Sequence, residues 1–423
     1  MFVQIRALLA RQSVRSAAWV FAGHGFNFLT QAVYFVLLAR VLGASEYGIF
    51  VGVFALVSIV SPYTALGGGV LFMRYVTQDR KLAPVYWGNS LLVTTATTLL
   101  IGVLSFWVGP ALTHNKGMPL ILANVVAACL FNQVVNTASR IFQTYERMAY
   151  SSALLVLTNA TRLAALVFLQ RTVHHSTATQ WALAWMIACA VPFLLAVILA
   201  QRMAGGIAFA PRLLLSRLWE GLTFSVSLTS VSLYNDFDKT ILSRNGLNIE
   251  NGFYTLGYRL IDFATTPMIA IDTALLPRFF QSSHLGVKAV AAKAFRSLGI
   301  AAPIGVGIAV LLWMTAPLVP LLAGKDFSQV PQVVRWLSLI PLLRGLHMIS
   351  GGALTGLGKQ HVRMGTQMLV ALFNVTLNLW LIPRYGWIAA CWTSLASDTL
   401  LATLNLSVLT WFRAAVSSSP TTM

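Results

Sequence analysis

The sequence predicts an all-α polytopic membrane protein with about twelve transmembrane helices, in two six-helix lobes related by a parallel internal repeat. Three observations support this fold class. The composition is strongly apolar, the apolar residues form runs long enough to cross a bilayer, and one stretch recurs about half a chain length later.

The composition indicates a membrane protein. Of the 423 residues, 57% are hydrophobic and only 9% are charged, whereas soluble domains carry about 25% charged residues. A soluble fold of this composition would expose large apolar patches. The formal charge of +18 does not indicate nucleic-acid binding, because Lys and Arg lie mostly in short gaps between apolar runs and not on basic, aromatic-interleaved segments.

The apolar runs predict the spans and the domain organisation. A membrane-spanning helix needs about 20 apolar residues. Candidate runs lie at 16–41, 47–72, 85–109, 119–141, 150–170, 179–201, 219–243, 252–280, 295–319, 332–357, 362–383 and 387–412. We therefore expect an N-terminal lobe at 1–201, a cytoplasmic linker at 202–218, a C-terminal lobe at 219–413 and a cytoplasmic tail at 414–423. The linker sequence LLLSRLW is compatible with a short amphipathic helix on the membrane surface.

An internal repeat supports the division into two lobes. The stretch LLARVLGASEYGIF (Leu37 to Phe50) aligns with ILSRNGLNIENGFY (Ile241 to Tyr254) at an offset of 204 positions. A repeat of this length indicates a duplicated unit. Charged and Gly positions match as well as apolar ones, namely Arg40 with Arg244, Glu46 with Glu250, Gly48 with Gly252, and further on Arg74 with Arg278.

The distribution of basic residues predicts the orientation. With the N-terminus inside, the inner segments hold 18 Lys and Arg residues and the outer segments hold 6. Cytoplasmic loops of membrane proteins carry the excess of positive charge, so we expect both termini in the cytoplasm. Each lobe has six spans, an even number, so the second lobe starts on the same side as the first, which defines a parallel repeat.

Polar residues lie on single faces of the first helices of each lobe. Ionisable groups within spans are costly and usually face a cavity. Residues spaced three or four apart share one helix face, so we expect these stripes to line a common central cavity. They comprise Ser225, Thr229, Ser232, Asp236 and Lys239 in the seventh span, Arg259, Asp262 and Thr266 in the eighth, and His24, Asn27 and Gln31 in the first, with Asp238 beside the first of these stripes.

A structural interpretation of the same residues stays open. Asp236 with Lys239, and Arg259 with Asp262, are spaced as i,i+3 ion pairs that would neutralise each other in the membrane. His24 alone is also compatible with a hydrogen bond between helices.

Motifs for catalysis or metal binding are not recognised. Gly67 to Gly69 lack a following GK[ST] and so do not form a phosphate loop, while His174 and His175 have no third metal ligand nearby in the sequence. Cys129, Cys189 and Cys391 lie in apolar runs without CxxC spacing, which favours packing roles. We expect a protein that is not an enzyme and that uses no cofactor or metal.

The chain resembles a known family over nearly its whole length. LARVLGASEYGIF after the first span, NGFYTLGYRL and LLPRFF around the eighth, and the segment from Gly358 to Ala390 containing LIPRYG are similar to bacterial polysaccharide flippases of the O-antigen type. That family belongs to the superfamily of multidrug and toxin extrusion transporters and the lipid II flippase. This chain departs from the lipid II flippase in having no room for two further C-terminal helices, and Leu247 replaces a usual Gly.

The resemblance implies lobes in a V shape, with spans 1, 2, 7 and 8 lining the cavity, in a multi-pass protein of the bacterial inner membrane. It implies a flippase that moves undecaprenyl-pyrophosphate-linked oligosaccharide to the periplasmic leaflet. A cationic cavity would lower the cost of moving a diphosphate across about 30 Å of hydrocarbon. Arg259 and Lys239 are the candidates for the diphosphate. His24, Asn27 and Gln31 are candidates for the sugar, Arg40 and Arg244 for the outer end, Arg74 and Arg278 for the inner end, and Asp236, Asp238 and Asp262 for ion coupling.

Other functions remain compatible with the sequence. A cation-coupled multidrug exporter would use the acidic residues, and a non-transporting subunit of a polysaccharide synthase complex would need no transport site. The expected partners are the lipid-linked oligosaccharide, membrane lipids, and a polysaccharide polymerase and glycosyltransferases of the same process.

Overall fold

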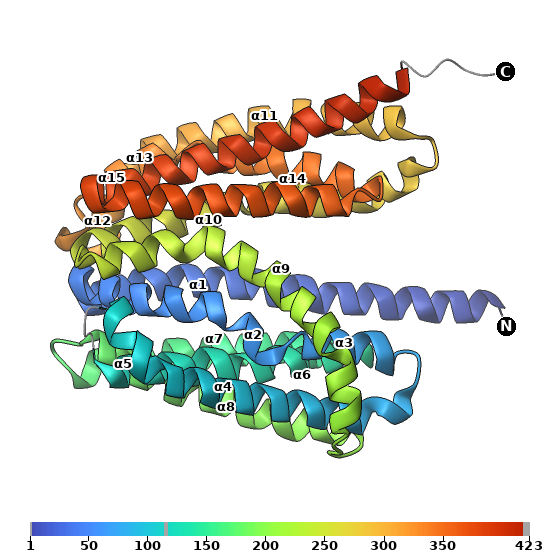
Figure 1. Ribbon diagram of the computed structural model, residues 1–423, viewed down its shortest axis with the longest axis horizontal. Coiled ribbons are helices and arrows are strands. Elements are labelled where there is room, and N and C mark those ends of the chain that lie inside the picture. The colour runs from blue at the N-terminus through green and yellow to red at the C-terminus, as the bar shows by residue number, and fades with distance from the viewer. Residues whose placement is uncertain (1, 114–116, 418–423) are drawn as a thin grey trace. The chain divides into compact units, whose positions relative to one another are not determined.

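The computed structural model is helical throughout the residues that it describes, which are 2–113 and 117–417, with side chains described for 30–414 except 108, 110–116, 227 and 231. No strand occurs in those ranges. Short 3₁₀ or π turns join some of the helices. The α-helices (Figure 1) are α1 (Phe2–Val60), α2 (Pro62–Ala65), α3 (Gly68–Val76), α4 (Ala83–Thr113), α5 (Met118–Val125), α6 (Asn132–Thr144), α7 (Met148–Thr172), α8 (Ala178–Ala204), α9 (Pro211–Arg244), α10 (Asn248–Ser283), α11 (Val287–Thr315), α12 (Val319–Ala323), α13 (Val330–Leu337), α14 (Ile340–Gly356) and α15 (Gln360–Ser417).

The helices group into two compact units. The first unit contains residues 1–42 and 49–232, and the second contains residues 43–48 and 233–423. Two helices therefore belong to both units, because α1 enters the second unit for a short segment and α9 changes unit near its middle. The linker expected at 202–218 does not form a separate helix, since its residues from Pro211 onward begin α9.

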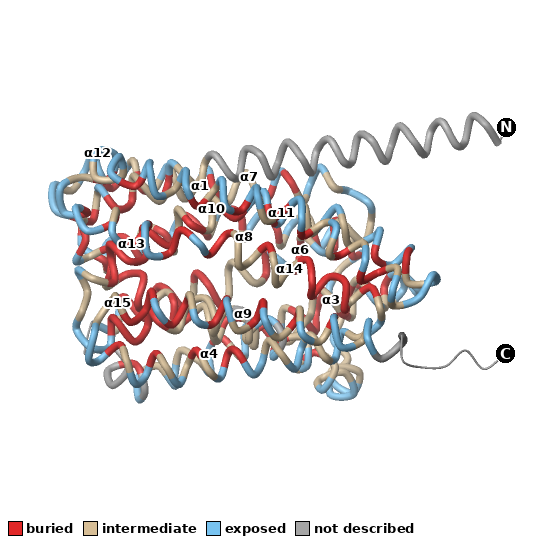
Figure 2. Tube along the Cα trace, turned by 90° about the horizontal axis from the view of Figure 1, so that it is seen from above, coloured by how far each residue is buried: buried red, intermediate tan, exposed pale blue. Residues whose placement is uncertain are grey.

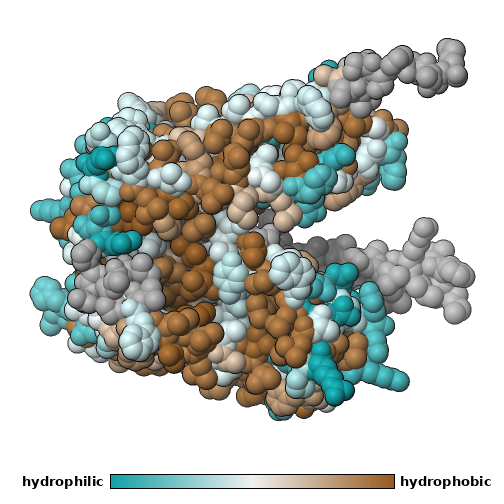
Figure 3. Space-filling view, in the orientation of Figure 1, coloured by the Kyte–Doolittle hydropathy of each residue, from teal (hydrophilic) through white to brown (hydrophobic). Residues whose placement is uncertain are grey.

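Eight helices or helix groups in the described ranges are long and apolar enough to span a membrane, or nine if the bent pair formed by 325–337 and 340–356 counts as one span. The predicted class, an all-α membrane protein, is confirmed. Along α4 the exposed positions lie mostly on one side, as expected for a helix whose outer face contacts lipid (Figure 2). Apolar side chains cover much of the surface visible in Figure 3.

The first unit is built around large aromatic residues packed against small ones. Trp87 of α4, Phe72 of α3 and Phe142 of α6 are fully buried in one cluster with Ala196 and Ala200 of α8. The alanines allow close approach of the backbones, as is usual in membrane helix packing. Helix α8 begins with a capping box, in which Thr177 and Gln180 satisfy each other's backbone N–H groups.

The second predicted span is interrupted. Helix α1 ends at Val60, and Leu66 and Gly67 have left-handed φ angles of 40° and 65° between α2 and α3. The interruption leaves backbone carbonyls of the preceding turn without helical partners. Ser225 of α9 donates a hydrogen bond to the Pro62 carbonyl at 2.9 Å, and Thr229 donates to the Ile59 carbonyl at 3.3 Å. Two residues of the predicted polar stripe thus stabilise a broken helix.

Residues 43–48 of the first copy of the repeated stretch meet the second copy within the second unit. Gly43 breaks α1 with a φ of 71°, and the segment that follows it crosses α10. A Cβ atom on Gly48 would overlap the carbonyl of Asn248, and one on Gly252 would overlap the carbonyl of Ala44. Equivalent glycines of the repeat therefore form the close contact from both sides.

The second copy makes its turn one position earlier than the alignment suggests. Gly246 takes the left-handed conformation, with a φ of 76°. Leu247, which occupies the aligned position, has a φ of −80°. The presence of Leu247 therefore does not prevent the turn.

Helix α15 is also broken by a glycine. Gly386 has a φ of 57°, and its backbone separates two long helical segments. The carboxylate of Glu250 accepts a hydrogen bond from the Trp387 N–H at 3.0 Å, which satisfies a donor released by the break. A side chain at Gly386 would overlap that carboxylate.

Candidate functional site

Charged side chains gather inside the second unit. They come from the C-terminal part of α9 and from α10, α14 and α15. The cations are Lys239, Arg259 and Arg344, and the carboxylates are Asp236, Asp238, Asp262 and Asp398, with His347 beside them.

Lys239 is the most buried of the cations, with its side chain 1% exposed. Its ammonium lies 2.9 Å from Asp236 Oδ1 and 3.7 Å from Asp238 Oδ1, and it donates a hydrogen bond to the Asn235 carbonyl. It also lies 4.6 Å from the centre of the Tyr258 ring. Lys239 is thus enclosed by partners.

Asp238 is held by groups other than Lys239 as well. The Tyr254 hydroxyl donates to Asp238 Oδ2, and the backbone N–H of Lys239 donates to Oδ1 at 2.7 Å. The Tyr254 hydroxyl is also 3.2 Å from the hydroxyl of Ser394. The carboxylate is therefore fixed between α9 and α10, with α15 next to it.

Asp262 bridges two arginines. Its Oδ2 lies 3.3 Å from Arg259 Nη1, and its Oδ1 lies 2.8 Å from Arg344 Nη1. The side chains of Arg259 and Asp262 are 24% and 33% exposed. These two groups are the most accessible members of the cluster. The Asp262 carboxylate contacts the guanidinium groups of both Arg259 and Arg344.

Asp398 is fully buried and lies at the other side of Arg344. Its Oδ1 accepts a hydrogen bond from the Tyr234 hydroxyl and lies 3.3 Å from His347 Nε2, while its Oδ2 lies 3.9 Å from Arg344 Nε. Arg344 also donates to the Tyr258 hydroxyl at 2.8 Å. Arg344 therefore connects the carboxylates of α10 and α15.

The predicted residues are thus partly brought together. Lys239, Asp236 and Asp238 form one ionic group, and Arg259 and Asp262 form another, so both i,i+3 ion pairs are present in the structure. The side chains of His24 and Asn27 lie outside the described residues, and Gln31 is half-buried. The four arginines expected at the ends of spans, Arg40, Arg74, Arg244 and Arg278, are all exposed.

Arg74 belongs to a separate polar group in the first unit. It forms an ion pair with Glu220, whose other carboxylate oxygen accepts a hydrogen bond from the Tyr75 hydroxyl at 2.8 Å. Arg217 stacks over the Tyr75 ring with its Cζ atom 4.3 Å from the ring centre. These residues connect α3 with the start of α9.

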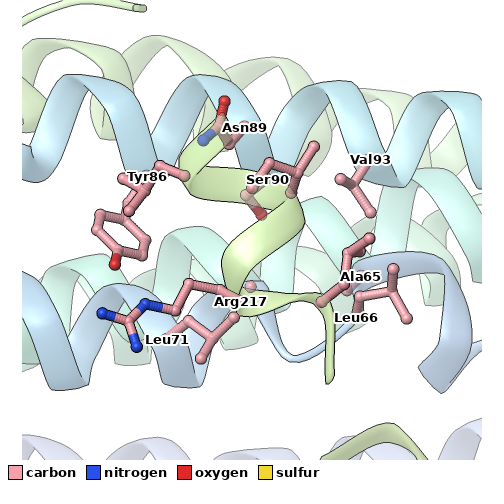
Figure 4. Close-up of a pocket in the computed structure, with 12 residues that line it drawn as sticks. Ala65, Leu66, Leu71, Tyr86, Asn89, Ser90, Val93 and Arg217 are labelled. Carbon is pink, nitrogen blue, oxygen red and sulfur yellow. The ribbon is translucent and has the colours of Figure 1, made fainter. Parts of the chain in front are cut away.

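A mostly apolar pocket adjoins that group (Figure 4). Its walls come from the α2–α3 region, α4 and the start of α9, and include Leu66, Leu71 and Val93. Figure 4 shows the Tyr86 hydroxyl and the Arg217 guanidinium on the same side of the pocket. This pocket lies in the first unit.

The sequence prediction of the site omitted several ionisable residues, among them Arg344, His347, Asp398 and, in the first unit, Arg162. Arg344 and His347 share a helix face at a spacing of three, and each of the four lies within a predicted span. The rule that intramembrane ionisable residues mark functional sites would have selected them. Among the described residues, no group of three His, Cys, Asp or Glu side chains is arranged to hold a metal ion.

Solved structures with a similar fold are transporters of one superfamily. An inward-facing multidrug resistance MATE family transporter of the MOP superfamily matches with a TM-score of 0.76 and 14% identity, covering 93% of this chain and 96% of that one. The lipid II flippase MurJ in an inward closed conformation matches with a TM-score of 0.71 and 11% identity, covering 96% and 88%. A MOP superfamily transporter from Pyrococcus furiosus, described as having a binding pocket of reverse polarity, matches with a TM-score of 0.60 and 14% identity, covering 96% of both chains.

No curated protein matches the sequence. A family model described as polysaccharide biosynthesis protein matches residues 13–283, which is more than half of the chain. The match confirms the family resemblance predicted from the sequence motifs. The chain belongs to the polysaccharide biosynthesis protein family.

Proposed function

We propose that this protein is a flippase that moves undecaprenyl-pyrophosphate-linked oligosaccharide across the bacterial inner membrane by alternating access, without enzymatic activity. The observation that carries the proposal is the accessible Arg259–Asp262–Arg344 group, found inside the membrane part of a member of the polysaccharide biosynthesis family. A solved relative by fold is named as a lipid II flippase, which supports a lipid-linked substrate.

We propose twelve crossings of the membrane. Eight candidate spans include two very long ones, 30–76 and 360–414, and the glycine breaks at Gly43 and Gly386 divide each of these into two passes. The bent pair at 325–356 and the 34-residue helix α9 supply the remaining two. Six passes then precede α9 and six begin with α9, an arrangement that supports a parallel repeat with both termini in the cytoplasm.

Arg259 is proposed as a residue that contacts the diphosphate. It is partly exposed, and its acidic partner Asp262 also contacts Arg344. Arg259 is the most exposed cation of the cluster, and arginine binds phosphate through two parallel hydrogen bonds. Lys239 is enclosed by two carboxylates of its own helix and lies 4.6 Å from the Tyr258 ring of α10, so we propose that it positions α9 against α10.

The acidic residues of the charged cluster also support a second function. In the charged cluster four carboxylates face three permanent cations, a balance that suits a cation-coupled multidrug exporter. The fold similarity to a MATE family transporter is compatible with it. In the flippase, Asp236, Asp238 and Asp262 are proposed as ion-coupling groups.

The function is tested by replacing Arg259 in a strain that lacks the native protein. Because Asp262 keeps Arg344 as a partner at 2.8 Å, Arg259→Ala does not strand a buried carboxylate, so the variant should accumulate in the membrane. We expect surface polysaccharide to fall at least tenfold. Arg259→Lys should restore part of it, since Lys keeps the charge but loses the planar fork.

Arg296→Ala serves as the control, because Arg296 is an exposed arginine on α11. Membrane abundance is measured beside the polysaccharide for every variant. Normal polysaccharide from Arg259→Ala at normal abundance would exclude the proposed contact. Export of cationic drugs in place of polysaccharide would favour the second function.

A further inference from the structure

Arg162 lies near the middle of α7, a helix long and apolar enough to span the membrane. Its guanidinium is surrounded by aromatic rings of the first unit. The Cζ atom lies 3.9 Å from the centre of the Tyr34 ring, 5.7 Å from that of Trp185 and 5.9 Å from that of Phe35. The residue is half-buried, and α1, α7 and α8 together form this aromatic site.

The first unit offers Arg162 no acidic partner. Its acidic residues are Asp79, Glu146 and Glu220 only. Asp79 caps a short 3₁₀ helix, Glu146 lies in the turn between α6 and α7, and Glu220 binds Arg74 and Tyr75. In the part of the chain that the structure describes, no carboxylate pairs with Arg162, and its buried Nε has no hydrogen-bond partner.

This arrangement leaves a positive charge uncompensated. An arginine at the centre of a span is costly to insert, and a ring quadrupole attracts the cation without neutralising it. The cluster of the second unit differs, because each of its cations faces a carboxylate. Arg162 is therefore a cation within a membrane-spanning helix whose charge an external anion can balance.

We propose that Arg162, with Tyr34 and Trp185, forms a binding site for an anionic group, either a phosphate or a carboxylate. The planar guanidinium binds both groups through paired hydrogen bonds. The rings fix its plane and leave its outer nitrogens for the ligand. Only the assignment of that anion to the head group of a transported lipid-linked oligosaccharide rests on the proposed function.

The binding experiment uses the full-length protein purified in detergent. Inorganic pyrophosphate and glucuronate are titrated separately by calorimetry, so that a phosphate and a sugar carboxylate are distinguished. We expect at least one of them to bind the wild-type protein. Arg162→Met should weaken that binding at least tenfold, and Arg162→Lys should give an intermediate affinity. Arg171→Met, an exposed arginine at the end of the same helix, should bind as the wild type does.

Unfolding temperature separates binding from a structural role. Without ligand, Arg162→Met should keep the wild-type Tm, because its removal strands no carboxylate. The bound anion should raise the Tm of the wild-type protein and of Arg171→Met, but not that of Arg162→Met. If Arg162→Met fails to fold, Arg162→Lys provides the comparison, and wild-type affinity in that variant overturns the role of the guanidinium.

Two further results would overturn the proposal. One is equal binding of the anion by wild-type protein and Arg162→Met, and the other is binding of neither anion by the wild-type protein. These outcomes are distinct from failure of the flippase function. Loss of anion binding with normal surface polysaccharide would leave the site in place and remove its role in transport.

Discussion

At the scale of single residues, the main finding is that the charges inside the second unit are shared between helices. Asp262 holds arginines from α10 and α14, and Arg344 reaches carboxylates on α10 and α15. The i,i+3 spacing of Arg259 and Asp262 along one helix is therefore only part of the interaction. The ion pairs of Asp262 and Arg344 therefore connect α10, α14 and α15.

Lys239 provides a test of this structural role. Lys239→Met should destabilise the protein by about 3–5 kcal/mol, because removing one partner of a buried ion pair strands the other. The stranded groups are Asp236 and Asp238. The measurement is the Tm in detergent together with the amount of protein in the membrane.

Lys325→Met is the matched control, since Lys325 is exposed, and it should leave the Tm unchanged. In the double variant Lys239→Met with Asp238→Asn, part of the lost stability should return, because one stranded charge is gone. A Lys239→Met protein as stable as the wild type would show that the carboxylates do not depend on the ammonium.

At the scale of the helices, glycines decide where long apolar stretches break and where helices approach. Gly43 and Gly386 interrupt α1 and α15 in conformations that residues with a Cβ rarely adopt. Gly48 and Gly252 have a different role, since each lies against a carbonyl of the other helix. The crossing of α1 and α10 thus depends on the absence of two side chains.

Gly252→Ala tests this crossing. The added methyl group would overlap the Ala44 carbonyl, and overpacking of this kind costs about 1–3 kcal/mol. We expect a lower Tm. Gly299→Ala is the control, because nothing lies within 4 Å of a Cβ placed there, and replacing an exposed helical glycine should be neutral or stabilising by up to about 1 kcal/mol. Equal stability of both variants would mean that the crossing has room for a methyl group.

At the scale of the whole molecule, the orientation in the membrane is the property most open to direct measurement. The excess of Lys and Arg in the inner segments predicts that the region between α8 and α9 is cytoplasmic. A fluorescent-protein fusion after Gly206 should be fluorescent, and an alkaline phosphatase fusion after His175 should be active. Phosphatase activity from a fusion at Gly206 would contradict both the orientation and the parallel repeat.

Much of the architecture could be predicted from composition and periodicity. A long apolar run indicates a membrane-spanning helix because a helix satisfies all backbone hydrogen bonds within its own segment. The predicted gaps between spans at Gly43 and Gly386 coincide with breaks in the structure. Part of the charged cluster was predicted, since it contains Asp236, Asp238, Lys239, Arg259 and Asp262. The proposed cavity, the assignment of the lobes and the roles of Arg40, Arg244 and Arg278 stay predictions.

By itself, the sequence determined the class of the protein, its approximate spans, the repeated stretch and one set of polar helix faces, because these depend on local composition and spacing. Only the tertiary structure decided which charges are partners. Arg344 and Asp398 are far apart in the chain, and Arg162 lies among rings from α1 and α8. Contacts of this kind arise from packing between helices that are distant in sequence, so no spacing along one helix can indicate them.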